Sequence, residues 1–259
     1  MDLELDGNVA LITASTSVVG LGHACAEALS TAGVDVALCG RNIDQLAMAS
    51  DRLDAVGEGD LVAFEADIRD PDHLAAVVEE TVDTFGRLDH LVTSTGWPTR
   101  STFVEATDEE WFHAFDHLFM SVVWAGRAAY PYLRESTAGS VVSILGPEVD
   151  HPEPESVLAN AFRRAVVGVL ETQAREFAPE VRVNAVAPGP YETPGLESHL
   201  RERTDEPLDR AFETESAAVP LDRLGEPREL GDVVAFLSSP RASYLTGATI
   251  PVDGGRSIG

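Results

Sequence analysis

The sequence predicts an α/β fold in which a parallel sheet lies between two layers of helices. Short apolar runs alternate along the chain with amphipathic stretches long enough for helices, which is the pattern of repeated strand–helix–strand units. A glycine-containing turn follows the first apolar run directly. The length of 259 residues suits one large core, and no repeat, linker or low-complexity tract divides the chain.

The apolar runs are the expected strands. The first six consist mainly of valine, leucine, isoleucine and alanine, as is typical of strands buried on both faces of a parallel sheet. They cover residues 9–12, 34–38, 61–64, 88–92, 141–145 and 181–186. A last run, residues 249–252, contains Pro251 and is expected at a sheet edge. The sequence therefore predicts a three-layer, doubly wound (Rossmann) sheet in a single domain, residues 1–259.

Two segments interrupt the alternation. Residues 146–155 hold Pro147, Pro152 and Pro154 among acidic residues and predict a loop after the fifth strand. Residues 190–220 are rich in proline and charge and predict a lid-like excursion with short helices.

The composition excludes several classes of partner. The formal net charge is −26, and every one of the 18 basic residues is arginine. Such a surface repels nucleic acid and anionic lipid, so neither is expected as a partner. The acidity fits either a well-solvated surface or adaptation to molar salt, and the absence of lysine favours salt adaptation.

The N-terminus and the cysteines predict a cytoplasmic protein. The first residues are acidic, without the basic and apolar regions of a signal peptide. The two cysteines, Cys25 and Cys39, lack C-x-x-C spacing, which fits a reducing compartment and offers no thiolate metal site.

The turn after the first strand is a candidate cofactor site. Gly20 and Gly22 precede a helical stretch, where backbone N–H groups and the positive helix terminus can receive a pyrophosphate; a plain tight turn is the alternative. The second strand is followed by Arg41, at the position where an acidic residue would bind a ribose 2′-hydroxyl. An arginine there favours NADP(H) over NAD(H), unless it is merely solvated at the turn.

Further motifs resemble the short-chain dehydrogenase/reductase family over the whole chain. They include residues 5–13, 66–68, 184–193, 227–231 and 242–255. The resemblance implies that Asp67 and Ile68 contact the adenine and that Pro188, Gly189 and Thr193 contact the nicotinamide amide. It also implies cofactor contacts for Thr13, Ser15, Thr95 and Gly96.

The family pattern is interrupted at the positions that usually carry the chemistry. The turn from Thr13 to Gly22 spans ten residues where the family pattern spans eight, and Ala14 replaces its first glycine. Two explanations of the longer turn fit: a simple two-residue insertion, or a long loop similar to that of divergent enoyl reductases. By counting from Gly168, the usual serine, tyrosine and lysine positions hold Gly146, Ala159 and Arg163, and the usual asparagine aligns with Leu118.

Few residues are available as replacements. Arg163 can hold ribose hydroxyls but cannot act as a base near neutral pH. Tyr191 is the phenol expected nearest the nicotinamide, with packing of the lid as its alternative role. Glu148, Asp150 and His151 either enter the pocket or form a solvated acidic loop. Residues 143–148 resemble the S-Y-L-G-A-E stretch of enoyl reductases.

A metal site is not expected. His113 and His117 have i, i+4 spacing, but no third ligand accompanies them, and packing against a partner subunit is the alternative role of their helix.

Two functions remain open at this point. The first is an NADP(H)-dependent oxidoreductase that reduces a C=C or C=O bond of an unidentified small molecule by a non-standard route. The second is a catalytically silent NADP(H)-binding relative that acts as a sensor or oligomer subunit. Under both, we expect a dimer or tetramer, with Ala161, Ala165 and Val169 at the seam.

Overall fold

The chain forms one doubly wound parallel sheet. The computed structural model describes residues 2–15, 17–149 and 151–258. Within them seven parallel strands follow the order β3-β2-β1-β4-β5-β6-β7. The strands are β1 (Val9–Ile12), β2 (Asp35–Gly40), β3 (Leu61–Glu65), β4 (His90–Thr93), β5 (Ser140–Ile144), β6 (Arg182–Pro188) and β7 (Thr249–Val252). The predicted fold is confirmed, and β7 with Pro251 lies at an edge as expected.

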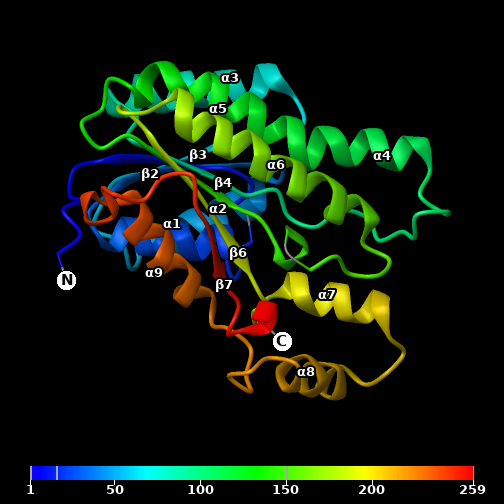
Figure 1. Cartoon of the computed structure of the whole chain (residues 1–259). Coiled ribbons are helices and arrows are strands. Elements are labelled where there is room, and N and C mark those ends of the chain that lie inside the picture. Colours follow the sequence, from blue (N-terminus) through cyan, green and yellow to red (C-terminus); the bar gives the residue numbers. More distant parts are fainter. Residues whose placement is uncertain (1, 16, 150, 259) are drawn as a thin grey trace.

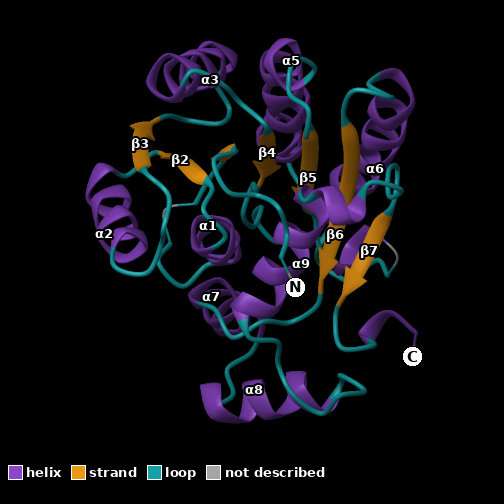
Figure 2. Ribbon diagram, turned by 90° about the vertical axis from the view of Figure 1, so that its left-hand side faces the viewer, coloured by secondary structure: helices purple, strands orange, loops and turns teal. Residues whose placement is uncertain are grey.

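Helices cover both faces of the sheet (Figures 1 and 2). One layer contains α1 (Leu21–Thr31), α2 (Ile43–Asp54) and α9 (Pro227–Ser238); the other contains α3 (Pro71–Phe85), α5 (Ser121–Leu133) and α6 (Val157–Glu176). Alternate residues of β1 face the two layers: Val9 and Leu11 pack with α3 and α5, whereas Ala10 and Ile12 pack with α1 and α9. The period of two explains why every position of this strand is apolar.

A helical arm precedes α5. It consists of α4 (Asp108–Ala114) and a π-helical segment, Phe115–Met120. The side chain of Thr107 accepts a hydrogen bond from the Glu110 backbone N–H, and Glu110 reaches back to Thr107, which forms a capping box at the start of α4. This arm brings His113 and His117 towards the carboxyl edge of the sheet.

Two short helices lie beyond the carboxyl ends of the strands. They are α7 (Pro194–Arg203) and α8 (Leu208–Ala217), within the segment predicted as a lid-like excursion, and the C-terminus lies beside them (Figure 1). In the described part of the chain, three 3₁₀ turns complete the fold: Pro147–Val149, Pro240–Ala242 and Arg256–Ile258. None of the helices among the described residues is both long and apolar enough to cross a membrane.

Candidate active site

Two adjoining pockets lie at the carboxyl edge of the sheet, where β1 and β4 diverge. We call them the Arg41 pocket and the Gly146 pocket after one lining residue of each. Their walls share four residues: Ala14, Thr95, Gly96 and Trp97. Open α/β sheets bind their ligands at this switch point, and a cleft in two connected parts fits an elongated dinucleotide.

The turn after β1 forms one wall of the Gly146 pocket. Ala14, Ser15, Gly20 and Gly22 all line it, and Gly20 directly precedes α1. Ala14 has a φ of 49°, the left-handed conformation that glycine adopts without strain. At the position of the family's first glycine, the backbone therefore has a conformation that favours glycine although alanine occupies it. Thr16, within this turn, lies outside the described residues.

Thr13 ties β1 to β4 rather than lining the cleft. Its hydroxyl donates to the carbonyl oxygen of Ser94 at 2.9 Å and accepts from the Ser94 backbone N–H at 3.0 Å. The following residues, Thr95 and Gly96, line both pockets. The hydrogen bonds of Thr13 thus hold the shared wall of the cleft in place.

The Arg41 pocket contains the residues predicted for the adenosine end. Arg41, Asp67 and Ile68 line it together. Sequence reasoning missed Arg69, whose guanidinium donates to both carboxylate oxygens of Asp67, with Nε 3.0 Å from Oδ1 and Nη2 2.5 Å from Oδ2. The hydrogen bonds from Arg69 lower the pKa of Asp67 to about 2. Arg41 is exposed at the rim of the same pocket.

The two helix histidines line the Arg41 pocket. His113 Nε2 lies 2.7 Å from Arg69 Nη1, and the His113 and His117 rings are 5.8 Å apart. Burial lowers the pKa of His117 to about 4, so its imidazole is neutral at neutral pH. The described residues contain no group of three or more side chains that could hold a metal ion.

A buried ion pair lies in the Gly146 pocket. Arg163 of α6 donates through Nη1 to Glu148 Oε2 at 2.8 Å and through Nη2 to the Gly96 carbonyl oxygen at 2.9 Å. The side chains of Arg163 and Glu148 are only 7% and 2% exposed. The guanidinium carbon also lies 5.2 Å from the centre of the Trp97 ring, within the range of a cation–π interaction.

Gly146 makes room for this pair. A Cβ atom at residue 146 would collide with Arg163 Nη1 and Glu148 Oε2. The ion pair therefore fills the space that a side chain at this position would enter. The residues at the usual tyrosine and asparagine positions, Ala159 and Leu118, are both buried and apolar.

The loop after β5, residues 146–155, is only partly the solvated acidic loop that the sequence offers as one alternative. His151 is exposed, but Glu148 is buried because the 3₁₀ turn Pro147–Val149 directs it inward, into the space beside Gly146. The solvated alternative is wrong for Glu148. Asp150 lies outside the described residues.

Arg163 is not fully satisfied by these contacts. Its Nε–H is buried and has no hydrogen-bond partner among the described residues. An orphaned donor of this kind costs free energy unless a ligand supplies an acceptor. A ribose hydroxyl is such an acceptor, so this site fits the cofactor contact predicted for Arg163.

Tyr191 has a packing role in the structure. It is 5% exposed, and its hydroxyl donates to the Val252 carbonyl oxygen at 2.8 Å. Burial raises the pKa of its phenol well above the usual value. Its ring lies against Gly225, where a Cβ atom would find no room. The geometry favours the alternative role, packing beneath the lid, over proton transfer.

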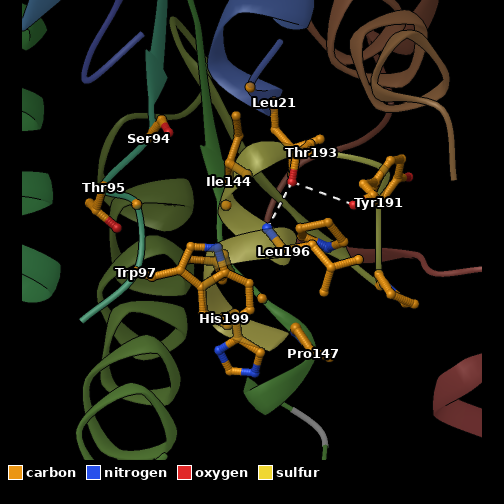
Figure 3. Close-up of a pocket in the computed structure, with 18 of the residues that line it drawn as sticks. Leu21, Ser94, Thr95, Trp97, Ile144, Pro147, Tyr191, Thr193, Leu196 and His199 are labelled. Atoms are coloured by element: carbon orange, nitrogen blue, oxygen red, sulfur yellow. Dashed lines mark hydrogen bonds between the residues drawn. The ribbon is translucent and has the colours of Figure 1, made fainter. Parts of the chain in front are cut away.

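The loop after β6 completes the cleft. Pro188, Gly189 and Thr193 line the Gly146 pocket, as the amide-contact prediction requires. The side chain of Thr193 accepts from the Leu196 backbone N–H at 3.2 Å and so caps α7 (Figure 3). Gly189 packs closely on Asp253, where a Cβ atom would be 2.8 Å from the Asp253 Cα atom.

Comparison with known proteins identifies the family. A family profile described as Enoyl-(Acyl carrier protein) reductase matches residues 16–257. The chain is 31% identical over 260 residues to the 3-oxoacyl-[acyl-carrier-protein] reductase FabG of Thermotoga maritima, covering 99% of this chain and 100% of that protein. The protein belongs to the short-chain dehydrogenase/reductase superfamily.

Solved structures of this superfamily match almost the whole length of the chain. L-sorbose reductase from Gluconobacter frateurii, complexed with NADPH and L-sorbose, superposes with a TM-score of 0.94 at 29% identity and covers 100% of both chains. An NADPH-bound short chain oxidoreductase from Pseudomonas aeruginosa PAO1, described as containing an atypical catalytic center, is 33% identical with a TM-score of 0.86 and covers 96% of both chains.

Sequence comparison with short-chain dehydrogenases/reductases did not reveal the polar residues on the lid side of the Gly146 pocket. They form two hydrogen-bonded groups. In the first, Arg100 contacts Glu155 and His199. In the second, Arg256 contacts Glu153 and Glu215, and Glu215 also pairs with Arg203. Their members come from the loop between β4 and α4, the 146–155 loop, α7, α8 and the C-terminal turn. No spacing in the sequence links such distant segments.

Proposed function

We propose that this protein is an NADP(H)-dependent oxidoreductase with a non-standard active site, which reduces a C=O or C=C bond of a small molecule. The observation that carries the proposal is the orphaned Nε–H of Arg163, buried beside the wall shared by the two pockets. An unpaired donor at this point suits a ligand that runs through both pockets. NADPH-bound relatives with closely similar folds support the choice of cofactor.

The chain's own residues divide the work of holding NADP(H). Arg41 offers a cation to the 2′-phosphate, and the Nε–H of Arg163 offers a donor to a ribose hydroxyl. The N-terminal turn of α1, with Gly20 and Gly22, receives the pyrophosphate. Pro188, Gly189 and Thr193 receive the amide. When bound, the cofactor supplies the hydride.

A catalytically silent NADP(H)-binding protein is the second candidate. The observation that favours it is the neutralisation of Arg163 by Glu148, because the pair leaves no net positive charge beside the reacting carbon. The phenol of Tyr191 is likewise occupied by Val252. Both functions require cofactor binding, so they are distinguished by whether the protein oxidises bound NADPH in the presence of a substrate.

Melting temperatures in molar KCl test the cofactor. NADPH at one hundred times its Kd should stabilise the folded state by about 2.7 kcal/mol, and NADH at the same concentration should stabilise it less. If neither nucleotide changes the melting temperature, the cofactor assignment is wrong. The variant Arg41→Gln should reduce the difference between the Kd values for NADPH and NADH, because it removes the cation offered to the 2′-phosphate.

Restoring the usual residues tests the non-standard site. The variant G146S/A159Y/R163K should gain carbonyl reduction if the scaffold is intact and only the chemistry has changed. Gly146→Ser alone should not, because its side chain would collide with Arg163 and Glu148. Absence of any gain in the triple variant, with NADPH still bound, would contradict this proposal.

We also propose a cytoplasmic homo-oligomer adapted to high salt, with neither nucleic acid nor membrane as partner. Ala161, Ala165 and Val169 are not buried within one chain, which leaves them available to a second copy. A light-scattering mass of one chain in molar KCl would contradict the oligomer. A melting temperature that does not rise from 0.1 to 2 M KCl would contradict the salt adaptation.

A further inference from the structure

His199 lies at the lid side of the Gly146 pocket. It is carried by α7 and is 8% exposed. Its ring stacks against Trp97, with 4.6 Å between ring centres and an angle of 31° between planes. Figure 3 shows the two rings next to each other, with Pro147 beside them. None of the roles assigned above uses this imidazole.

The hydrogen bonds of His199 determine its tautomer. Arg100 Nη1 lies 3.0 Å from His199 Nε2. A guanidinium only donates hydrogen bonds, so Nε2 must accept and the ring proton must be on Nδ1. Arg100 is itself held by Glu155, whose Oε2 accepts from Nη2 at 2.7 Å. No hydrogen bond joins Nδ1 to another described residue, which leaves its N–H for a ligand.

The surroundings keep the imidazole neutral. Burial, followed by the charge of Arg100, lowers the pKa of His199 below its usual value. The other charged groups that face it are Glu153, Arg203 and Glu215, of which the carboxylates act in the opposite direction. A second proton on Nε2 would also point at Arg100. His199 is therefore a neutral donor at neutral pH.

The other titratable side chains around the reacting end of the pocket are engaged, and His23, whose ring nitrogens have no partner among the described residues, is carried by α1 at the other wall. Glu148 accepts from Arg163, and Tyr191 donates to Val252. Glu153 and Glu215 are carboxylates bound by Arg256 and have no proton to donate. Among the uncharged titratable side chains that the structure describes on the lid side, His199 alone presents an N–H without a hydrogen-bond partner.

We propose that the Nδ1–H of His199 donates a hydrogen bond to the oxygen of a ketone or enone substrate. This inference rests on the proposed function and names its substrate class. A neutral imidazole can stabilise the negative charge that develops on this oxygen during reduction. The reduction takes a hydride from the cofactor and a proton from water, while His199 keeps its own proton.

Two substitutions separate the two ring nitrogens. His199→Asn retains an N–H close to the position of Nδ1, whereas His199→Gln reaches towards Arg100 and loses the Nδ1 donor. With NADPH and a panel of an α-diketone, a cyclic enone and a β-keto thioester, kcat/KM should fall about 100-fold for His199→Gln and less for His199→Asn. The Kd for NADPH should be unchanged in both. Arg201→Gln, an exposed change on the same helix, is the matched control.

A pH profile and a second variant exclude a purely structural role. In the wild type, kcat/KM should fall on the acid side, because a protonated Nε2 can no longer accept from Arg100 and the ring then loses the position that aims Nδ1–H at the substrate. His199→Asn should lack this limb. Arg100→Met, which frees the tautomer without altering the ring, should lower kcat/KM several-fold. If the wild type reduces a probe and the kcat/KM of His199→Gln is within threefold of the wild-type value, this inference is overturned while the proposed function stands. A wild type that binds NADPH but reduces no probe would overturn the proposed oxidoreductase and, with it, this inference.

Discussion

Each pocket contains an arginine paired with a carboxylate, and the two pairs differ in their access to water. Asp67 and Arg69 of the Arg41 pocket are 26% and 32% exposed, whereas Glu148 and Arg163 of the Gly146 pocket are 2% and 7% exposed. Water screens the first pair and allows it to exchange partners at little cost. The second pair cannot exchange partners at low cost, because separation would leave each charge unpaired in a medium of low dielectric constant.

The largest expected effect follows from breaking the buried pair. Glu148→Ala should lower the free energy of unfolding by about 3–5 kcal/mol, because it leaves the Arg163 cation buried without its partner. Urea unfolding at fixed KCl concentration measures the change. The double variant E148L/R163M, which removes both charges, should recover most of the loss. A single variant as stable as the wild type would show that water reaches Arg163.

A second buried group should make the protein sensitive to acid. His23 is 2% exposed, neither of its ring nitrogens has a hydrogen-bond partner in the described chain, and burial lowers its pKa to about 4. The unfolded chain binds this proton near pH 6.5, so stability is complete above that value and falls between pH 6.5 and 4. The loss from this residue is at most about 3 kcal/mol.

The variant His23→Met tests this residue. It should flatten the decline of unfolding free energy between pH 6.5 and 4, measured by urea titrations at several pH values. His151→Met, which changes an exposed histidine, should leave the decline as it is. An unchanged slope in His23→Met would place the acid sensitivity at the other histidines whose pKa values are lowered by burial, namely His90, His117 and His199.

The two pockets also differ in how far the sequence could predict them. Apolar runs and the edge proline predict the sheet, because burial on both faces leaves continuous apolar runs that can be read locally. Arg41 directly follows β2, so its position predicts its role, whereas Asp67 is predicted from the family motif at residues 66–68. The burial of Glu148 could not be predicted, since it depends on the space left by Gly146 and on a 3₁₀ turn.

Long-range contacts explain the remaining omissions. Arg100 and His199 are 99 residues apart, and the tautomer of the imidazole is fixed by one hydrogen bond between the loop that precedes α4 and α7. Arg69 was overlooked although it is two residues from Asp67, because the family pattern assigns no role to that position. Pairing of side chains follows from tertiary packing and leaves no periodic signal in the sequence.

An intermediate effect is expected for closing the space at residue 146. Gly146→Ala should cost about 1–3 kcal/mol, because the new methyl group displaces Arg163 or Glu148 from a close-packed site. The matched control is Gly168→Ala in the same helix as Arg163, where a Cβ atom meets nothing within 4 Å. The control should gain about 0.5–1 kcal/mol from helix propensity. Equal effects at both positions would mean that the ion pair does not need the glycine.

The smallest effect is expected at the exposed pair. Asp67→Asn should change the unfolding free energy by less than about 1 kcal/mol at neutral pH, and by less still in 2 M KCl, since both partners are screened. Without screening, the lowering of the Asp67 pKa from 3.8 to about 2 would correspond to about 2 kcal/mol, and water and salt reduce this contribution. The contribution is complete above the unfolded value near 3.8 and disappears as the pH falls towards 2. Urea unfolding at both salt concentrations measures the change. A loss as large as that of Glu148→Ala would contradict the contrast between the pockets, because exposure would then not decide what an arginine–carboxylate pair contributes.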